Sequence, residues 1–413
     1  MKIVHRICCG IDVHAKFLVA CLICDGTKET RKFSTMTDEL LSLRDWLTSK
    51  GCTHVAIEST GVYWKPVFNI LESALTVVLI NPEHARVLRG RKTDVKDAEW
   101  LADLLQHGLV TPSFIPPPEI RELRELTRYR ESLVREHTAV ANRIQKLIES
   151  GNIKLGQVAT DVLGASGRAM LRALARGETD AGKMADLARG ALKEKRGSLT
   201  RALEGRLTMA QRFVLKELLQ RIEELEDARK RVDRQIEQAM NDPSHPKLAW
   251  AWKNLQTIPG VGQRVAEVVI AEIGVQMHEV FPTDGHLASW AGMCPGNKAS
   301  GGKRMSGKTR HGNTYLRSAM VQAGWASSMT KRTYLSAQYQ RLARRLGRKK
   351  ALVAVAHSIL VIIYHILDRE QSYTELGGDY FDRQHVDKQR DYLLRRLAAL
   401  GLKVRIDEEP AAA

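Results

Sequence analysis

Two apolar runs stand side by side in residues 7–24, whose sequence is Ile-Cys-Cys-Gly-Ile-Asp-Val-His-Ala-Lys-Phe-Leu-Val-Ala-Cys-Leu-Ile-Cys. Apolar runs of this length, bounded by short polar turns, are typical of buried β-strands. We expect strands at Ile7–Val13 and Phe17–Cys24, and a third at Thr30–Phe33 after a turn at Asp25-Gly26. The three strands would form a meander.

Helices and strands alternate after this meander. The expected elements are helices at about Thr37–Ser49 and Tyr63–Ser73, strands at His54–Glu58 and Leu75–Ile80, and two short helices, the second starting near Thr93. This order of elements is that of the ribonuclease H-like fold, an α/β fold. Parallel strands with helical crossovers are buried on both faces, which agrees with the wholly apolar sequence at residues 77–80.

Two heptad patterns predict a helical middle part beyond Pro116-Pro117-Pro118. The first comprises Leu126, Leu133, Val140 and Leu147, and the second comprises Leu215, Leu218, Ile222, Leu225, Val232, Ile236 and Ala239, with Arg229 at one seam position. The two helices could pack on each other within one chain or pair between subunits. We favour pairing between subunits, because a polar seam residue is better tolerated in a coiled coil that specifies its partner.

The chain is long enough for two or three domains. We place an α/β domain at 1–118, a helical and coiled-coil region at 119–245 with an insertion at about 151–205, and a mostly helical domain at 246–376. A charged tail, 377–413, follows.

Positive charge dominates the composition. Lys and Arg outnumber Asp and Glu by 64 to 47, and residues 285–367 contain fourteen Lys or Arg and no Asp or Glu. A solvated surface normally mixes both signs, so this stretch indicates a polyanionic partner, nucleic acid before other polyanions. An anionic membrane is the competing partner, but we expect no amphipathic anchor and no apolar run of spanning length.

The six cysteines predict a reducing compartment. Most lie in apolar strand-like segments without a signal peptide before them, so we expect free thiols in a cytoplasmic protein. Cys21 and Cys24 have the spacing of zinc ligands. In a strand they would face opposite ways, and no second pair follows, so zinc is not expected.

Four carboxylates are candidate metal ligands. Asp12 follows Gly10-Ile11, Glu58 ends a predicted strand, and Asp94 and Asp97 share one face of a predicted helix. The first and fourth strands are neighbours in this topology, so Asp12 and Glu58 can meet at the strand ends. Clustered carboxylates repel one another unless cations are bound, and we expect Mg²⁺ in a two-metal site for phosphodiester chemistry. Singly, each could be a surface acid or a helix N-terminal acid.

A glycine-containing turn predicts contact with a duplex. The sequence Ile258-Pro259-Gly260-Val261-Gly262 precedes Arg264. Gly260 and Gly262 permit a tight hairpin between two helices, and the free amides that begin the second helix can bind a DNA phosphate. Such a helix-hairpin-helix positions DNA without distinguishing bases. An ordinary helix turn is the alternative.

A glycine-rich cationic loop follows, with Ser300, Ser306 and the candidate nucleic-acid-binding residues Lys298, Lys303, Arg304, Lys308 and Arg310. Gly302–Thr309 matches the phosphate-loop pattern, but we reject an ATP site because no strand precedes it and no acid follows for many residues. By chemistry alone, Ser300 and Ser306 are nearly equal candidates for a nucleophile toward a phosphodiester. Simple phosphate binding is the alternative.

Jointly these motifs resemble those of the DEDD transposases of bacterial insertion sequences, the "one-hundred-ten" type. The resemblance extends from about Cys9 to Leu367. It rests on Gly10–His14, Glu58–Trp64, Asn81-Pro82, Lys92–Ala98, Ile258–Gly262, and Trp290–Pro295 leading to Ser300-Gly301-Gly302.

The resemblance implies a catalytic domain like that of the Holliday-junction resolvase RuvC at 1–118 and a transposase domain at 246–376. It implies that Asp12, Glu58, Asp94 and Asp97 use Mg²⁺. It also implies that Ser300 attacks the DNA backbone and holds the strand covalently, without ATP.

The resemblance also implies partners. A structured bridge RNA from the element would pair with donor and target DNA. Subunits would assemble as a tetramer, a dimer of dimers, in which the acids of one subunit work with the serine of another. The family pattern assigns no role to 151–205 or to the tail, and RNA contact is our hypothesis for the former.

Three functions therefore compete. The first is an RNA-guided DNA recombinase. The second is a junction-resolving endonuclease of the same fold, which would need only the acids and water and would leave Ser300 without a task. The third is a non-catalytic nucleic-acid-binding regulator, which would leave the four acids unexplained.

Overall fold

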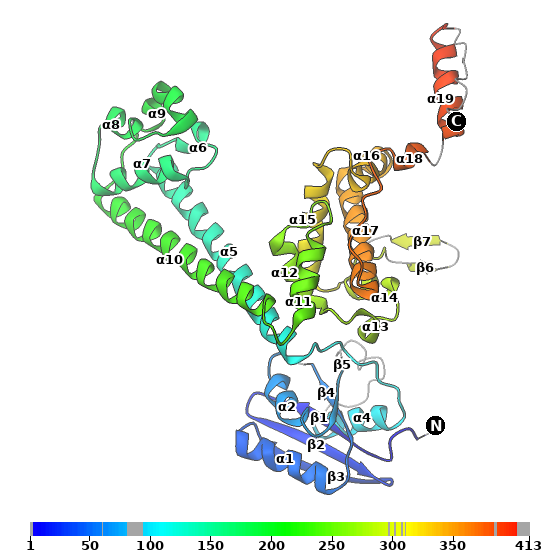
Figure 1. Ribbon diagram of the computed structural model, residues 1–413. Coiled ribbons are helices and arrows are strands. Elements are labelled where there is room, and N and C mark those ends of the chain that lie inside the picture. The colour runs from blue at the N-terminus through cyan, green and yellow to red at the C-terminus, as the bar shows by residue number, and fades with distance from the viewer. Residues whose placement is uncertain are drawn as a thin grey trace. The chain divides into compact units, whose positions relative to one another are not determined.

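A computed structural model describes residues 3–59, 61–80, 94–295, 298–300, 303–306, 309, 311–383 and 386–402. For residues 94, 298–300, 303–306 and 386–389 the description covers the backbone alone. The chain divides into two compact units, Met1–Ile115 and Pro116–Ala413, and each is described by itself (Figure 1).

A mixed five-stranded sheet forms the centre of the first unit (Figure 1). Its strands are β1 (Ile7–Val13), β2 (Phe17–Cys24), β3 (Thr27–Ser34), β4 (His54–Glu58) and β5 (Thr76–Ile80). Their spatial order is β3-β2-β1-β4-β5, with antiparallel pairing among β1, β2 and β3, and with β4 and β5 parallel to β1. The predicted strands are confirmed. Strand β3 begins earlier than expected because Thr27 already pairs with Cys24 across a two-residue turn, in which Asp25 and Gly26 both have positive φ.

Helices cover both faces of the sheet. On one face, α1 (Thr37–Ser49) and α2 (Trp64–Leu71) share a core cluster with Ile11. On the other face, α4 (Asp94–Gln106) shares a second cluster with Cys8. Successive strand residues point to opposite faces, so the nearly continuous burial of β1 follows from these two layers.

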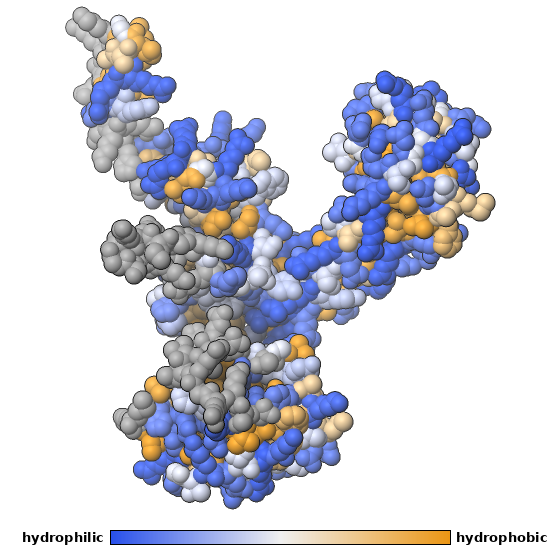
Figure 2. All heavy atoms as spheres, turned by 180° about the vertical axis from the view of Figure 1, so that it is seen from behind, coloured by the Kyte–Doolittle hydropathy of each residue, from blue (hydrophilic) through white to orange (hydrophobic). Residues whose placement is uncertain are grey.

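Two long helices form a hairpin in the second unit (Figure 1). They are α5 (Pro118–Ser150) and α10 (Met209–Met240), and they run antiparallel: near one end, Gln211 Nε2 donates to Ser150 Oγ at 3.1 Å. The pairing between subunits that we favoured for the heptad seams is therefore wrong, because their apolar residues are buried within one chain. Hydrophilic residues cover most of the visible hairpin surface in Figure 2, with an apolar patch near its far end.

The buried seam differs in part from the heptad prediction. Leu133 and Val140 of α5 are buried as expected, whereas Leu126 and Leu147 are only half-buried. The buried residues of α10 are Leu215, Leu219, Ile222, Leu225, Val232, Ile236 and Met240, so Leu219 and Met240 replace the expected Leu218 and Ala239. Helix α10 packs on further helices besides α5, which widens its buried face beyond that of a two-helix seam.

Short helices between α5 and α10 form a compact tip at the end of the hairpin. They are α6 (Leu155–Val158), α7 (Ala165–Arg176), α8 (Ala181–Ala185), the 3-10 helix η1 (Gly190–Lys195) and α9 (Arg196–Ala202). Backbone hydrogen bonds close the base of the tip, with Lys154 N donating to Ala202 O at 2.8 Å and Arg206 N to Gly151 O at 2.9 Å.

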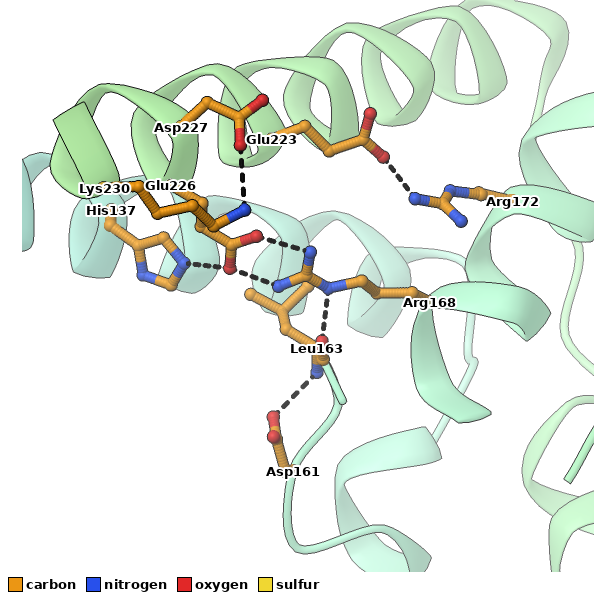
Figure 3. A network of polar contacts seen from close by, with 9 residues as sticks. All are labelled: His137, Asp161, Leu163, Arg168, Arg172, Glu223, Glu226, Asp227 and Lys230. Atoms are coloured by element: carbon orange, nitrogen blue, oxygen red, sulfur yellow. Dashed lines mark hydrogen bonds and ion pairs between the residues drawn. The ribbon is translucent and has the colours of Figure 1, made fainter. Parts of the chain in front are cut away.

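An ion-pair network attaches the tip to the hairpin (Figure 3). Arg168 of α7 donates to both carboxylate oxygens of Glu226 on α10, with Nη1 2.7 Å from Oε2, and His137 Nε2 of α5 lies 3.3 Å from Glu226 Oε1. The hydrogen bonds from Arg168 lower the pKa of Glu226 to about 2. One turn away, Arg172 pairs with Glu223 at an exposed position.

The remaining chain is mostly helical. Its elements are α11 (Pro246–Leu255), α12 (Gln263–Ile273), α13 (Met277–Val280), α14 (Asp284–Trp290), β6 (Lys298–Ser300), β7 (Lys303–Ser306), α15 (Thr314–Ser328), α16 (Tyr334–Leu346), α17 (Arg348–Arg369), α18 (Tyr380–Arg383) and α19 (Val386–Ala399).

Helix α17 corrects one expectation. Contrary to the prediction of no apolar run of spanning length, α17 is long and apolar enough, by length and composition, to cross a membrane, alone among the helices of the described residues. Half of its most apolar window is buried, and the helix packs against α14, α15 and α16. We therefore interpret α17 as the core helix of this part of the chain.

Replacing Glu226 by Gln should loosen the tip. A depressed pKa in the folded state means that the stabilisation is present above about pH 4.5 and is lost as the pH falls toward 2. We expect Glu226→Gln to cost about 1–3 kcal/mol of tip stability at neutral pH. Hydrogen–deuterium exchange should then be faster in residues 155–202. Glu223→Gln removes only the exposed pair and should leave exchange unchanged; equal acceleration in both variants would contradict a special role for Glu226.

Candidate active site

Asp12 and Glu58 lie at corresponding positions of adjacent parallel strands. The β1–β4 register pairs Gly10 with Ala56 and Ile11 with Ile57, so Asp12 and Glu58 follow the last of these pairs. Asp12 is 9% exposed and Glu58 is half-buried. The carboxyl ends of parallel strands are where α/β proteins commonly bind ligands. The expectation that the two residues come together at the strand ends agrees with this register.

His14 is a neighbour of Asp12 to which we gave no role from the sequence. Its Nε2 atom lies 3.1 Å from Asp12 Oδ2. The sequence did contain a signal for this neighbour, because side chains two residues apart along a strand lie on the same side of the sheet. A ring nitrogen at this distance can orient the carboxylate.

Helix α4 crosses β1 at Gly10 with almost no space between the backbones. A Cβ atom at Gly10 would overlap Ala98 O and Ala102 N of α4. The helix runs antiparallel to β1, because Cys8 Sγ contacts Ala102 O (3.7 Å), further along the helix. The start of α4 therefore lies toward the Asp12 end of β1.

This placement brings the four candidate positions to one end of the sheet. Asp94 and Asp97 are on the first turn of α4, and Asp97 is half-buried. The side chain of Asp94 lies outside the described residues. Among the described side chains, no group of three His, Cys, Asp or Glu is close enough to hold a metal ion. The four candidate residues are therefore brought to one end of the sheet by their backbone positions, and not by a cluster of three or more described side chains.

The predicted helix-hairpin-helix segment corresponds to α11, α12 and their turn. Gly260 has φ +90°, and a Cβ there would lie 2.5 Å from both Ala323 O and Ser327 N of α15. The glycine is therefore required by close packing as well as by the turn. Gly262 precedes α12 with extended backbone, and exposed Arg264 lies in the first turn, its Nη2 3.7 Å from Asp233 Oδ2.

The serine segment is a β-hairpin and not the expected loop. Strands β6 and β7 pair antiparallel, with Ser300 opposite Lys303 at one end and Lys298 opposite Ser306 at the other, which we call the base. The side chains of Ser300, Ser306, Lys298, Lys303 and Arg304, and all of Lys308 and Arg310, lie outside the described residues.

This hairpin also corrects the reason for rejecting an ATP site. A strand does precede Gly302, since β6 ends at Ser300. The phosphate-loop pattern nevertheless fails, because residues 303–306 are themselves a paired strand and so cannot form a loop around a phosphate.

Two buried carboxylates of α12 were missed by sequence reasoning. Glu267 and Glu272 are almost fully buried, and arginines of α5 neutralise both. Arg130 pairs with Glu267, and Arg128 donates to both oxygens of Glu272 at 2.8 and 2.9 Å. Arg124 adds hydrogen bonds to the carbonyls of α12, including Glu272 O at 2.8 Å. In the sequence, the only sign of these two buried carboxylates is that charged residues stand within the apolar face of this helix.

Glu272 also reaches the segment that follows the serine hairpin. Asn313 Nδ2 donates to Glu272 Oε2 at 2.6 Å, while Asn313 Oδ1 caps α15 by accepting from Leu316 N. Before it, Gly312 lies against the backbone of Ala291 and Gly292 so closely that a Cβ would overlap them. Gly312 and Asn313, which follow the hairpin in sequence, are thus fixed on α12, α15 and the end of α14.

Comparison with known proteins identifies the family. A model for IS110 DEDD transposases, described as "Transposase", matches residues 9–152, and one described as "Transposase IS116/IS110/IS902 family" matches residues 252–340. Together they match more than half of the chain. The chain belongs to this family of insertion-sequence transposases, which are DNA-recombining enzymes with DNA substrates, as the motif resemblance implied.

Two curated relatives agree with this family. The chain is 24% identical over 336 residues to the transposase for insertion sequence element IS1111A of Coxiella burnetii, covering 78% of this chain and 79% of the relative. It is 28% identical over 305 residues to an insertion element IS110 uncharacterized 43.6 kDa protein of Streptomyces coelicolor, covering 67% of this chain and 70% of the relative.

Gly10→Ala should displace α4 from the sheet. The added methyl group meets backbone atoms that cannot rotate away, so we expect a loss of about 3 kcal/mol or more in stability. Gly197→Ala on α9 is the control, because its Cβ meets nothing within 4 Å. Thermal unfolding measures both variants. A Gly10→Ala protein as stable as the control would show that the contact is not tight.

Glu272→Ala should destabilise the second unit strongly. It leaves Arg128 and Asn313 without their shared acceptor and removes the ion pair of Arg124, and removing one partner of a buried ion pair costs about 3–5 kcal/mol. Glu279→Ala removes an exposed acid of α13 and should cost little. Chemical denaturation of the full chain measures the difference, and similar midpoints for the two variants would contradict a central role for Glu272.

Proposed function

We propose that this transposase cuts and rejoins DNA through a carboxylate-bound divalent metal and a serine nucleophile. One observation carries the proposal: positions 12, 58, 94 and 97 lie at one end of the sheet, although Asp94 and Asp97 are distant from Asp12 in sequence. The strand order β3-β2-β1-β4-β5, with the first three strands antiparallel, supports a ribonuclease H-like, RuvC-like fold for this unit.

The donor chemistry of these residues fits Mg²⁺. Mg²⁺ prefers oxygen ligands and commonly uses one or two carboxylates together with water and phosphate. Asp12 and Glu58 would hold the ion from the strand ends, Asp94 and Asp97 from α4, and His14 would orient Asp12. When bound, the ion would stabilise the charge that develops on the attacked phosphate.

Ser300 is the proposed nucleophile because of its place in the hairpin. It is the last residue of β6 and pairs with Lys303, the first residue of β7, whereas Ser306 pairs with Lys298 at the other end of the two strands. The Ser300 hydroxyl would lose its proton, form a bond from Oγ to phosphorus, and release a deoxyribose oxygen. The adduct keeps a phosphate ester, so rejoining needs no ATP.

Nucleic-acid contacts are proposed for the second unit. The acid-free stretch 285–367, the turn at Gly260 and Gly262 with Arg264, and the cations Lys298, Lys303, Arg304, Lys308 and Arg310 would bind the phosphate backbone. Family resemblance supports a bridge RNA as a second nucleic acid, and domains at 1–118, 119–245 and 246–376.

A tetramer is also proposed. The apolar seam of the hairpin is used within the chain, so subunit contacts must use other surfaces. Met209 and Phe213, at the start of α10, are 88% and 64% exposed. Exposed apolar residues of this size are typical of protein interaction sites.

A trapping experiment tests the mechanism. Full-length protein, its element's RNA, Mg²⁺ and labelled donor-junction DNA are mixed and separated on a denaturing gel. Wild type and Ser306→Ala should retain label on the protein, and Ser300→Ala should retain none. Asp12→Asn should lower cleavage by about a hundredfold or more, because it weakens metal binding while keeping the side-chain shape.

Other outcomes identify the competing functions. Cleavage without an adduct, unchanged in Ser300→Ala, would indicate a resolvase that uses water. Retained nucleic-acid binding with no cleavage by the wild type would indicate a regulator. An adduct lost in Ser306→Ala and kept in Ser300→Ala would move the nucleophile to the base of the hairpin.

A further inference from the structure

A cavity of about 480 Å³ lies in the second unit, away from the serine hairpin in sequence. One side is a face of α17, where His357, Val361, His365 and Arg369 recur every four residues. The other side is residues 371–376, which follow α17, together with Tyr334 at the start of α16. Cavities of this volume are typical of small-ligand sites.

Hydrogen bonds hold the walls of the cavity in place. Glu375 accepts from the backbone N–H groups of Tyr334 at 2.7 Å and of Gly377 at 2.9 Å. Ser372 Oγ donates to Asn254 Oδ1 of α11 at 2.6 Å. The segment after α17 is thus tied to α16 and to α11, so the cavity is formed without a ligand.

Aromatic and apolar groups make one part of the lining. Tyr334 packs edge-on against Tyr380 (5.0 Å between ring centroids) and stacks on Phe381 (5.4 Å), which fixes the orientation of its ring. Tyr373 also lines the cavity, and burial raises the pKa values of both tyrosines. Val361 and Ile362 add an aliphatic surface. Flat ligands with a π-face bind such surfaces by stacking.

One arginine and several hydrogen-bonding groups make the rest of the lining. His357, His365 and Arg369 line the cavity, and no lining residue in the described part of the chain carries a carboxylate. Arg369 is exposed and forms no ion pair with a described carboxylate. An arginine without an ion-pair partner among the described residues favours an anionic ligand, and the nearby carboxylate of Glu375 is occupied by hydrogen bonds from Tyr334 N, Gly377 N and Tyr373 Oη.

Two buried polar atoms at this wall have no partner in the described part of the chain. His365 Nδ1 is one, and Gln338 Oε1 is the other. Gln338 is next to the lining, since its Nε2 donates to Ser358 Oγ at 3.0 Å. Both atoms are closed to solvent, so the hydrogen-bonding groups open to a ligand are those of the lining itself, which include Ser358, Gln371, Ser372 and Thr374.

We propose that this cavity binds one unpaired nucleotide of the DNA or RNA on which the transposase acts. The base would stack within the tyrosine and aliphatic part, and the 5′-phosphate would lie by Arg369. A nucleotide combines a flat π-face, hydrogen-bonding edges and a negative charge, which are the three features that the lining complements. The inference rests on the proposed function only in taking nucleic acid as the source of the nucleotide.

The test measures binding of thymidine 5′-monophosphate and uridine 5′-monophosphate to the full chain by saturation-transfer NMR. Both should bind, with the strongest saturation on base protons, and inorganic phosphate should not displace them at equal concentration. Arg369→Gln should weaken binding about tenfold, because a charge-assisted hydrogen bond is lost. Arg143→Gln removes an exposed arginine of α5 outside the lining and should change binding less than about twofold.

A second variant fills the cavity without changing charge. Ile362→Trp should abolish saturation of the base protons while the melting temperature stays close to that of wild type. A labelled single strand should bind more weakly to Ile362→Trp than to wild type, whereas a fully paired duplex should bind both equally.

Three results would overturn the inference. They are no saturation of either nucleotide, displacement by phosphate alone, and equal loss in Arg369→Gln and Arg143→Gln. In each case, retained duplex binding and serine adduct formation would leave the proposed function standing. If the wild type formed no adduct but still bound the nucleotides, the proposed function would be contradicted and the proposed nucleotide site would stand.

Discussion

The second unit depends on two carboxylates that α12 keeps away from water. Burying Glu267 and Glu272 is costly unless each is neutralised, and the arginines of α5 do this across more than a hundred residues of sequence. The two carboxylates hold α12 against the long helix α5. Glu272 also binds Asn313, the residue that caps α15 after the serine hairpin. Helix α12 is central because it packs on α5 on one side and on α15 on another. A proposed nucleophile needs such a rigid base, since a displacement of about 1 Å at a reacting atom can cost about a hundredfold in rate.

A different constraint organises the first unit. The absence of a side chain at Gly10 lets α4 approach β1 to backbone contact, and this approach decides where the helix begins. Strand register places Asp12 beside Glu58, and the course of α4 adds the positions of Asp94 and Asp97 to the same end of the sheet. The backbone positions of carboxylates from separate elements thereby lie at one end of the sheet. This suits a metal that is bound jointly by protein and substrate, because its ligands can remain apart until both are present.

Under the two proposals, the acid-free stretch and the cavity would have complementary tasks in nucleic-acid binding. Cations of the acid-free stretch would attract any phosphate backbone, with affinity that falls as salt rises. A cavity that accepts a single base cannot bind a stacked, paired strand, and so it would favour unpaired positions. The pair of Arg168 with Glu226 holds the helical tip to the hairpin (Figure 3).

The sequence by itself determined the strands, their order along the chain, the family and the candidate residues, because these depend on local patterns and short motifs. Strand alternation at residues 7–24 and the strand-ending position of Glu58 needed no tertiary information. The pairing of α5 with α10 did need tertiary information. The apolar residues of a heptad seam can be buried against a helix of the same chain or of another chain, and only the folded connection through the tip brings these two helices together within one chain. The same holds for Glu272, whose partners Arg128 and Asn313 are far away in sequence, and for the hairpin that replaced a loop at Ser300. Tertiary structure decided these features because each depends on contacts between distant segments, whose free energy appears only when the segments are brought together.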